Sequence, residues 1–218
     1  INMFELGFIM KNSKDNRVNT LILIFILLTI FISTLATAIT HSADEKVTKV
    51  FTDVEKSLIE LKQSDFFNKA AIKEILNNNL LPEVNTRYFT YKVLGQHLAK
   101  LSDNTKTEFI NELALQLIDS YSQLLSKYNN EAIKVTQSTL SKSGKIAMVN
   151  IAIVAPEKTN NAIVKLIKLD NENWQFFDIV VEGISLLQSK QSEINASINK
   201  VGVEDTLTLL KKLNQNST

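Results

Sequence analysis

The sequence predicts an α+β fold in which about six helices pack on a curved, four-stranded antiparallel sheet around a single apolar core or pocket. Three observations lead to this fold class. Apolar residues recur every three or four positions up to residue 128, every second position over residues 131–181, and every three or four positions again after that. The first period is typical of amphipathic helices and the second of strands with one buried face. We find no internal repeat and no linker, so one domain is expected.

An uncharged run near the N-terminus indicates that part of the chain meets a membrane. Residues 18–40 contain no charged side chain, and their centre is almost wholly aliphatic. Lys11, Lys14 and Arg17 precede the run, and the small residues at 36–38 close it. This succession of basic, apolar and small residues is typical of a cleavable signal peptide.

The signal segment divides the chain into two parts. Met10 is the expected start, because it leaves a short basic stretch before the apolar run, and cleavage is expected near Ala38. Residues 1–43 therefore form the N-terminal region and residues 44–218 the folded domain. An uncleaved inner-membrane anchor is the alternative, because about 20 apolar residues can span a bilayer. Both possibilities place the domain outside the cytoplasm.

Two helices are predicted before the first proline. The first follows Asp44, and its apolar positions are Val47, Val50, Phe51, Val54, Leu58 and Leu61. The second is expected to begin at Ser64 or Asp65, since both residue types are good N-caps, and to end in the Asn cluster before Leu80. Pro82 then breaks the helical pattern.

Two further helices are predicted between residues 86 and 128. One runs from about Thr86 to Leu101, with Gly95 at a position where another element could approach closely. The other is opened by Ser102 or Asp103. Its apolar stripe consists of Phe109, Leu113, Leu117, Tyr121, Leu124 and Tyr128. Because the opposite face is polar, this helix should lie at the surface with one side in the core.

Four strands of an antiparallel meander follow. They are predicted over residues 131–140, 145–155, 161–169 and 173–181. Apolar and polar side chains alternate along them, so that Val164 and Leu166 share one face and Lys165 lies on the other. One face of the sheet is therefore strongly apolar. Such a face can belong to a filled core or to a pocket, and periodicity leaves that choice open.

Two helices complete the predicted domain. The apolar residues of the first are Ile184, Leu187, Ile194, Ile198 and Val201, and Gly202 ends it. Those of the second are Val203, Leu207, Leu210 and Leu213. Acidic residues begin this last helix and Lys211 and Lys212 end it, as the helix dipole favours.

Composition excludes several classes of function. Twenty-four Lys and Arg residues balance 23 Asp and Glu residues, and no basic block occurs, so nucleic acid is not an expected partner. The absence of cysteine excludes disulfides, thiolate catalysis and thiolate metal sites. The two histidines, His41 and His97, form no known catalytic or metal-binding motif. We therefore predict no catalytic residue, no metal site and no cofactor.

One pair of carboxylates supports a competing hypothesis. Asp178 and Glu182 lie four residues apart at the end of the fourth strand, and paired carboxylates can perform acid–base catalysis. The chain could then be a small-molecule enzyme of cone-shaped α+β fold that uses either residue as a base. The favoured interpretation is that both make turn and cap hydrogen bonds at a strand-to-helix junction. A third hypothesis is a periplasmic adaptor with a filled core and no ligand.

The same junction carries a motif that resembles a known family. The pattern W-x-x-x-D-x-x-x-E-G-x-S is similar to the hallmark of the MlaC, or toluene-tolerance auxiliary, family. Its positions are occupied by Trp174, Asp178, Glu182, Gly183 and Ser185. The Leu-Leu-Pro stretch at 80–82 and Val-Leu-Gly-Gln at 93–96 also resemble family segments, and the similarity covers residues 45–214. His97 and Leu98 depart from it, because an aromatic pair usually follows Val-Leu-Gly-Gln.

This resemblance implies a periplasmic phospholipid carrier that catalyses no reaction. Such a carrier would shuttle glycerophospholipid between an outer-membrane lipoprotein complex and an inner-membrane ABC transporter, and so maintain outer-membrane lipid asymmetry. Each buried acyl CH₂ is worth about 0.8 kcal/mol, so two acyl chains need an apolar pocket to cross water.

Ten residues are expected to line that single lipid pocket. Those on the apolar sheet face are Val149, Ile151, Val164, Leu166, Phe177, Ile179 and Val181. Those on the helix side are Tyr88, Leu94 and Ile184. Alternation along the strands supports the first group.

Overall fold

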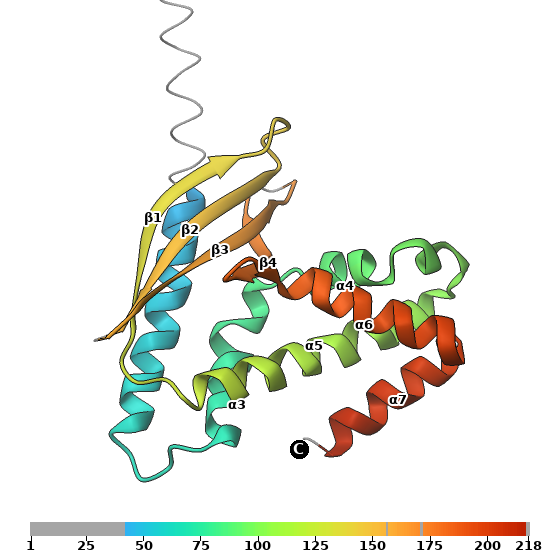
Figure 1. Cartoon of the computed structure of the whole chain (residues 1–218), viewed down its shortest axis with the longest axis horizontal. Helices are drawn as coiled ribbons and strands as arrows, with labels where there is room; N and C mark the ends of the chain where they lie inside the picture. Colours follow the sequence, from blue (N-terminus) through green and yellow to red (C-terminus); the bar gives the residue numbers. More distant parts are fainter. Residues whose placement is uncertain (1–41, 156, 171, 217–218) are drawn as a thin grey trace, which may run out of the picture. The chain divides into compact units, whose positions relative to one another are not determined.

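A computed structural model describes residues 42–155, 157–170 and 172–216 of the chain. The chain from Ser42 onward forms one compact unit (Figure 1). The predicted signal segment and its cleavage site lie outside the described residues. Within the described part of the chain, no helix is both long enough and apolar enough to cross a membrane.

The helix over residues 42–62 lies along one face of the sheet (Figure 1). The indole Nε1 of Trp174 donates a hydrogen bond to Ser42 Oγ at 3.0 Å. Further along the helix, the Phe51 ring stacks on Phe176 with 6.1 Å between the ring centroids. The apolar stripe predicted for this helix therefore covers the apolar face of the sheet.

Helix α3 (Lys69–Asn79) begins later than predicted. Ser64 and Asp65, the expected caps, lie in the turn that precedes it. The cap is Asn68, whose side-chain oxygen accepts a hydrogen bond from the Ala71 backbone N–H at 3.0 Å. The expected start was wrong because three residue types that favour N-cap positions, Ser, Asp and Asn, follow one another within five positions.

The segment predicted as one helix from Thr86 to Leu101 is two elements. A short 3₁₀ turn, η1 (Leu81–Glu83), leads into helix α4 (Thr86–Leu94). Gly95 ends α4 with a φ of 50°, and the chain continues as the 3₁₀ helix η2 (Gly95–Lys100). The prediction of a continuous helix was wrong because Gly95 has a positive φ, which glycine tolerates and an α-helix does not.

Helix α5 (Asp103–Leu125) is the longest element, and its predicted start is confirmed. Ser102 Oγ accepts a hydrogen bond from the Thr105 backbone N–H at 3.1 Å. The N-terminal half of α5 buries its stripe in a cluster with α4 and the last two helices. Its C-terminal half contributes Ile118 to a second cluster, with α3 and the helix over residues 42–62. The helix therefore joins two apolar clusters.

Replacing Ser102 by alanine should lower the free energy of unfolding by about 1 kcal/mol, because the Thr105 N–H loses its acceptor. Urea unfolding followed by circular dichroism measures this change. Ser126→Ala at the other end of α5 is the control, since its hydroxyl only donates to the Gln123 carbonyl. That control should cost less than about 0.5 kcal/mol. Equal losses in the two variants would contradict a capping role.

The sheet contains five strands in chain order, and all neighbouring strands are antiparallel. They are β1 (Ala132–Leu140), β2 (Ile146–Val154), β3 (Thr159–Lys168), β4 (Trp174–Val181) and β5 (Ile184–Ser185). The first four confirm the predicted strands to within two residues. The expected count of four was one short, because the residues of β5 were assigned to the start of the following helix.

The register aligns apolar residues of neighbouring strands on one face. Val164 of β3 lies opposite Val149 of β2 and opposite Ile179 of β4. A register shift between β3 and β4 leaves one extra residue, Phe177, on β4. As a result the consecutive residues Phe176 and Phe177 are both buried, which simple alternation does not allow.

Helices α6 (Leu186–Val201) and α7 (Val203–Asn216) close the described chain. Gly202 separates them with a φ of 88°, as predicted from its position after the last apolar residue of the first helix. The first helix starts two residues later than expected, because Ile184 belongs to β5 and Ser185 is the N-cap.

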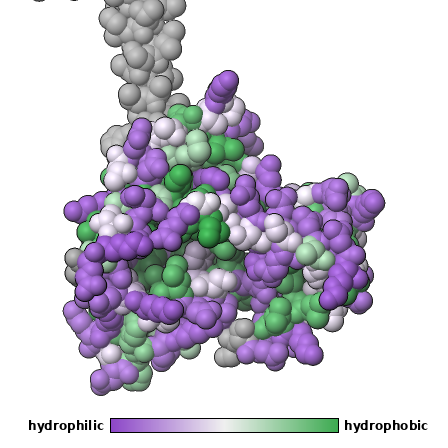
Figure 2. Space-filling view, viewed as in Figure 1, coloured by the Kyte–Doolittle hydropathy of each residue, from purple (hydrophilic) through white to green (hydrophobic). Residues whose placement is uncertain are grey.

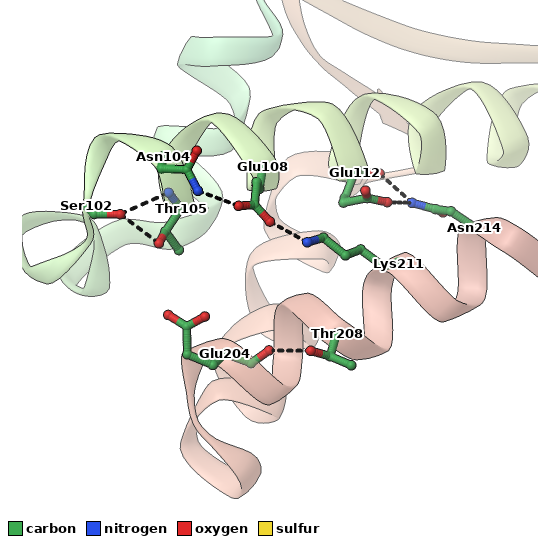
Figure 3. Close-up of polar contacts among 9 residues, drawn as sticks. All are labelled: Ser102, Asn104, Thr105, Glu108, Glu112, Glu204, Thr208, Lys211 and Asn214. Carbon is green, nitrogen blue, oxygen red and sulfur yellow. Dashed lines mark hydrogen bonds and ion pairs between the residues drawn. The ribbon is translucent and has the colours of Figure 1, made fainter.

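Polar contacts fasten α7 to α5 (Figure 3). Lys211 forms an ion pair with Glu108, and hydrogen bonding to this ammonium lowers the pKa of the Glu108 carboxyl. One turn further along each helix, Asn214 Nδ2 donates to the Glu112 carboxylate at 2.6 Å. The C-terminal helix is therefore held by apolar contacts on one side and by this polar seam on the other.

Candidate functional site

A cavity of about 360 Å³ lies between the apolar face of the sheet and the helices. Its volume falls within the range of about 300 to 1,000 Å³ that small-molecule sites occupy. Most of its wall is apolar and comes from the helix over residues 42–62, from α5, and from strands β1 to β4. The polar exceptions are Glu55, Tyr121, Lys127, Tyr128, Glu131, Asn160 and Asp178. Figure 2 shows apolar residues in a recess bordered by hydrophilic ones.

Five of the ten residues predicted to line a pocket lie at this cavity. They are Ile151, Val164, Phe177, Ile179 and Val181. All five belong to the sheet, and the register places Val164 directly beside Ile179. The apolar face that alternation identified is therefore the face that bounds the cavity.

The other five predicted residues lie elsewhere. Val149 and Leu166 are fully buried on the same sheet face but outside the cavity, which covers only part of that face. Leu94 is buried in the cluster of α4 to α7. Tyr88 packs edge-on against the Phe177 ring at 5.1 Å, and Ile184 is 68% exposed.

Sequence reasoning missed the helical wall of the cavity. That wall includes Phe51, Val54, Leu58, Leu117, Tyr121 and Leu124. Each of these residues stands in a predicted apolar stripe, so its inward direction was correct. An apolar stripe does not show whether a residue packs against a neighbouring element or lines a cavity, because both cases produce the same helical periodicity.

Four of the polar lining residues gather at one end of the cavity. Lys127, Tyr128 and Glu131 belong to the connection between α5 and β1. Asn160 lies opposite Ile153, which in turn lies opposite Ile133 near the start of β1. The connection and the start of β3 are therefore at the same end of the strands.

Two tyrosines present uncharged hydroxyls to the cavity. Burial raises the pKa of Tyr128 to about 12, and the nearby carboxylates of Glu55 and Glu131 add to this shift. Burial also raises the pKa of Tyr121 well above its usual value, with a smaller contribution from Asp178. Because both phenols keep their protons at neutral pH, they add hydrogen-bond donors to the wall and no negative charge.

The residues of the family-like motif build the junction between β4 and α6. The carboxylate of Asp178 is fully buried and accepts three hydrogen bonds. Lys165 Nζ donates at 2.9 Å, Ser185 Oγ at 2.8 Å and the Leu187 backbone N–H at 3.0 Å. Ser185 also caps α6 by accepting from the Gln188 N–H at 3.1 Å. A single carboxylate therefore ties β3, β4 and the start of α6 together.

The remaining motif residues shape the turn. Glu182 and Gly183 both have positive φ, 50° and 82°, which reverses the chain between β4 and β5. The Glu182 side chain is exposed and pairs with Lys158 at 3.1 Å. Trp174 is buried beneath the start of the helix over residues 42–62, where it bonds Ser42. Among these five motif residues, Asp178 alone reaches the cavity wall.

The carboxylates considered for acid–base catalysis have different partners. Asp178 accepts three hydrogen bonds from residues of the β4–α6 junction, while Glu182 forms an ion pair with Lys158 at the surface. His97 Nε2 is buried and makes no hydrogen bond to any described residue. The described part of the chain contains no group of three or more His, Asp or Glu side chains placed to hold a metal ion. The arrangement observed for Asp178 is the cap and turn bonding that the favoured interpretation expected.

Comparisons with known proteins point to one family. The family model described as MlaC protein matches residues 33–212. A relative from Haemophilus influenzae, named intermembrane phospholipid transport system binding protein MlaC, is 25% identical over 175 residues, which cover 78% of each chain. The solved structure of a phospholipid-binding protein from Ralstonia solanacearum, in complex with a phospholipid, matches with a TM-score of 0.71 at 16% identity. That match covers 81% of this chain and 98% of the solved chain, and it establishes a shared fold.

Proposed function

Because the chain belongs to the MlaC protein family, we propose that it is a phospholipid carrier that holds two acyl chains in the cavity between sheet and helices. The matched relative is named as the binding protein of an intermembrane phospholipid transport system. The carrier itself would bind and release its cargo without a chemical step.

The cavity is the observation that carries this proposal. Its wall is mainly aliphatic and aromatic, and two of its charged groups, Lys127 and Glu131, stand together at one end. Acyl chains gain about 0.8 kcal/mol for each CH₂ that leaves water, so such a wall favours them over polar ligands. We assign tail contacts to Ile151, Val164, Phe177, Ile179 and Val181, and to the facing residues of α5.

The proposal extends to the location and the partners of the protein. Residues 1–43, with a start at Met10 and cleavage near Ala38, would export residues 44–218 to the periplasm, unless the segment stays as an inner-membrane anchor. The carrier would receive and deliver phospholipid at an outer-membrane lipoprotein and an inner-membrane ABC transporter. The name of the Haemophilus influenzae relative supports the transport role, and the apolar run at 18–40 supports export.

Phospholipid should co-purify with the protein. The full chain is produced in a bacterial host, purified and denatured, and its organic extract is analysed by mass spectrometry and phosphorus assay. We expect close to one diacyl phospholipid per chain, because a cavity with this wall is poorly hydrated when empty. Protein that carries no lipid and also refuses added phospholipid would refute the carrier function and would leave the fold unchanged.

A further inference from the structure

The polar end of the cavity has a chemistry that acyl chains do not need. Lys127, Tyr128, Glu131 and Asn160 lie there together, and Glu55 stands close enough to Tyr128 to perturb its phenol. Two carboxylates and at least one ammonium group therefore border this end of a mainly apolar cavity.

Within the described part of the chain, the cations at this end form no ion pair with a carboxylate. The ion pairs formed within the described residues include neither Lys127 nor Lys62. Lys62 Nζ lies 5.6 Å from the centroid of the Tyr128 ring, and it donates a long hydrogen bond of 3.5 Å to Asn129. An ammonium group without an ion pair can offer its charge to an anionic group of a ligand.

One neutral group at this end is also incompletely bonded. Asn160 Oδ1 is buried and makes no hydrogen bond to another described residue. Buried polar atoms are nearly always paired in folded proteins, so this oxygen indicates a missing partner. It can accept a hydrogen bond from a polar head group.

The carboxylates of Glu55 and Glu131 can bind a positively charged group of a ligand whose phosphate is bound by the ammonium group. Glu131 Oε2 accepts from the Asn129 backbone N–H at 2.7 Å, which leaves its other oxygen free to accept from a ligand. Glu55 lines the cavity from the helix over residues 42–62 and lies close to Tyr128. Two negative side chains beside Lys127 would repel a purely anionic head group and attract an ammonium group.

We propose that this end of the cavity binds a zwitterionic phospholipid head group, with its phosphate on Lys127 and its amine on Glu55 and Glu131. The inference rests on the proposed carrier function and adds a head-group preference to it. The acyl chains would extend from here along the apolar wall toward Phe51 and Phe176.

Competition between three lipids with identical acyl chains tests this assignment. The full chain is incubated with equal amounts of dioleoyl phosphatidylethanolamine, dioleoyl phosphatidylglycerol and dioleoylglycerol, and native mass spectrometry measures the occupancy of each. The wild type should prefer them in that order. Lys127→Gln should lower both phospholipids relative to dioleoylglycerol by about three- to tenfold, the effect of losing one partly exposed charged contact. Glu131→Gln should lower phosphatidylethanolamine relative to phosphatidylglycerol by about threefold.

Lys142→Gln is the matched control, because it removes an exposed charge from the turn between β1 and β2, at the opposite end of these strands. It should leave the wild-type ratios unchanged. If Lys127→Gln behaves like Lys142→Gln, the phosphate site is wrong while the carrier function stands. If Glu131→Gln leaves the ratio of the two phospholipids unchanged, the amine site is wrong. Wild-type protein that takes up none of the three lipids would overturn the carrier function itself.

Discussion

Asp178→Ala should lower the free energy of unfolding by about 2 to 4 kcal/mol. The carboxylate is fully buried and accepts from Lys165, from Ser185 and from the Leu187 backbone, so its removal leaves three donors without their partner. We place the estimate below the upper range for broken buried ion pairs, because Lys165 is 27% exposed and can turn toward water. Urea unfolding of the purified variant measures the loss.

Glu182→Ala is the control for this experiment. Glu182 belongs to the same motif and also makes an ion pair, but both partners are largely exposed. Exposed pairs contribute little, so this variant should lose less than about 1 kcal/mol. A loss for Asp178→Ala no larger than that for Glu182→Ala would show that the junction does not depend on the buried carboxylate.

Ile179→Asp should reduce co-purified phospholipid at least about tenfold while the protein still folds. Ile179 lies on the cavity wall and is only half-buried, so a carboxylate there can stay hydrated in the empty protein. Acyl chains that enter the cavity would strip that water away, and the uncompensated charge opposes their binding. Phosphorus assay of the purified protein gives lipid per chain, and circular dichroism checks the fold.

Val180→Asp provides a matched comparison on the same strand. Val180 is also half-buried, but it lies on the opposite face of β4 and does not reach the cavity. We expect this variant to keep the wild-type lipid content even if its melting temperature falls. Similar lipid loss in both variants would mean that general destabilisation, rather than charge in the cavity, removes the lipid.

Alternation, turn residues and cap residues predicted the strands and the helix ends that depend on neighbouring positions in the chain. The four long strands were located to within two residues, since alternation and turn residues are properties of neighbouring positions. The Ser102 cap and the stop at Gly202 were predicted correctly for the same reason. The start of α3 was not, because several neighbouring residues offered equally good cap signals. The break at Gly95 was not, because it depends on the positive φ that this glycine takes in the fold.

The family motif was visible in the sequence, but the reason for its spacing was not. Asp178 and Ser185 are seven residues apart and meet because positive φ at Glu182 and Gly183 turns the chain back. Lys165 joins them from the neighbouring strand through the register of β3 and β4. The motif thus serves the positioning of α6 against the sheet.

The sequence by itself determined the α+β class, the apolar face of the sheet and the inward side of each long helix, because periodicity records which side of an element is buried. Tertiary structure alone decided where that apolar surface stays open. Val149 and Val164 are neighbours on one face, yet the cavity reaches only Val164. The physical reason is that a cavity depends on the spacing of elements far apart in the chain, here the helix over residues 42–62, α5 and the sheet, and this spacing leaves no mark on local periodicity.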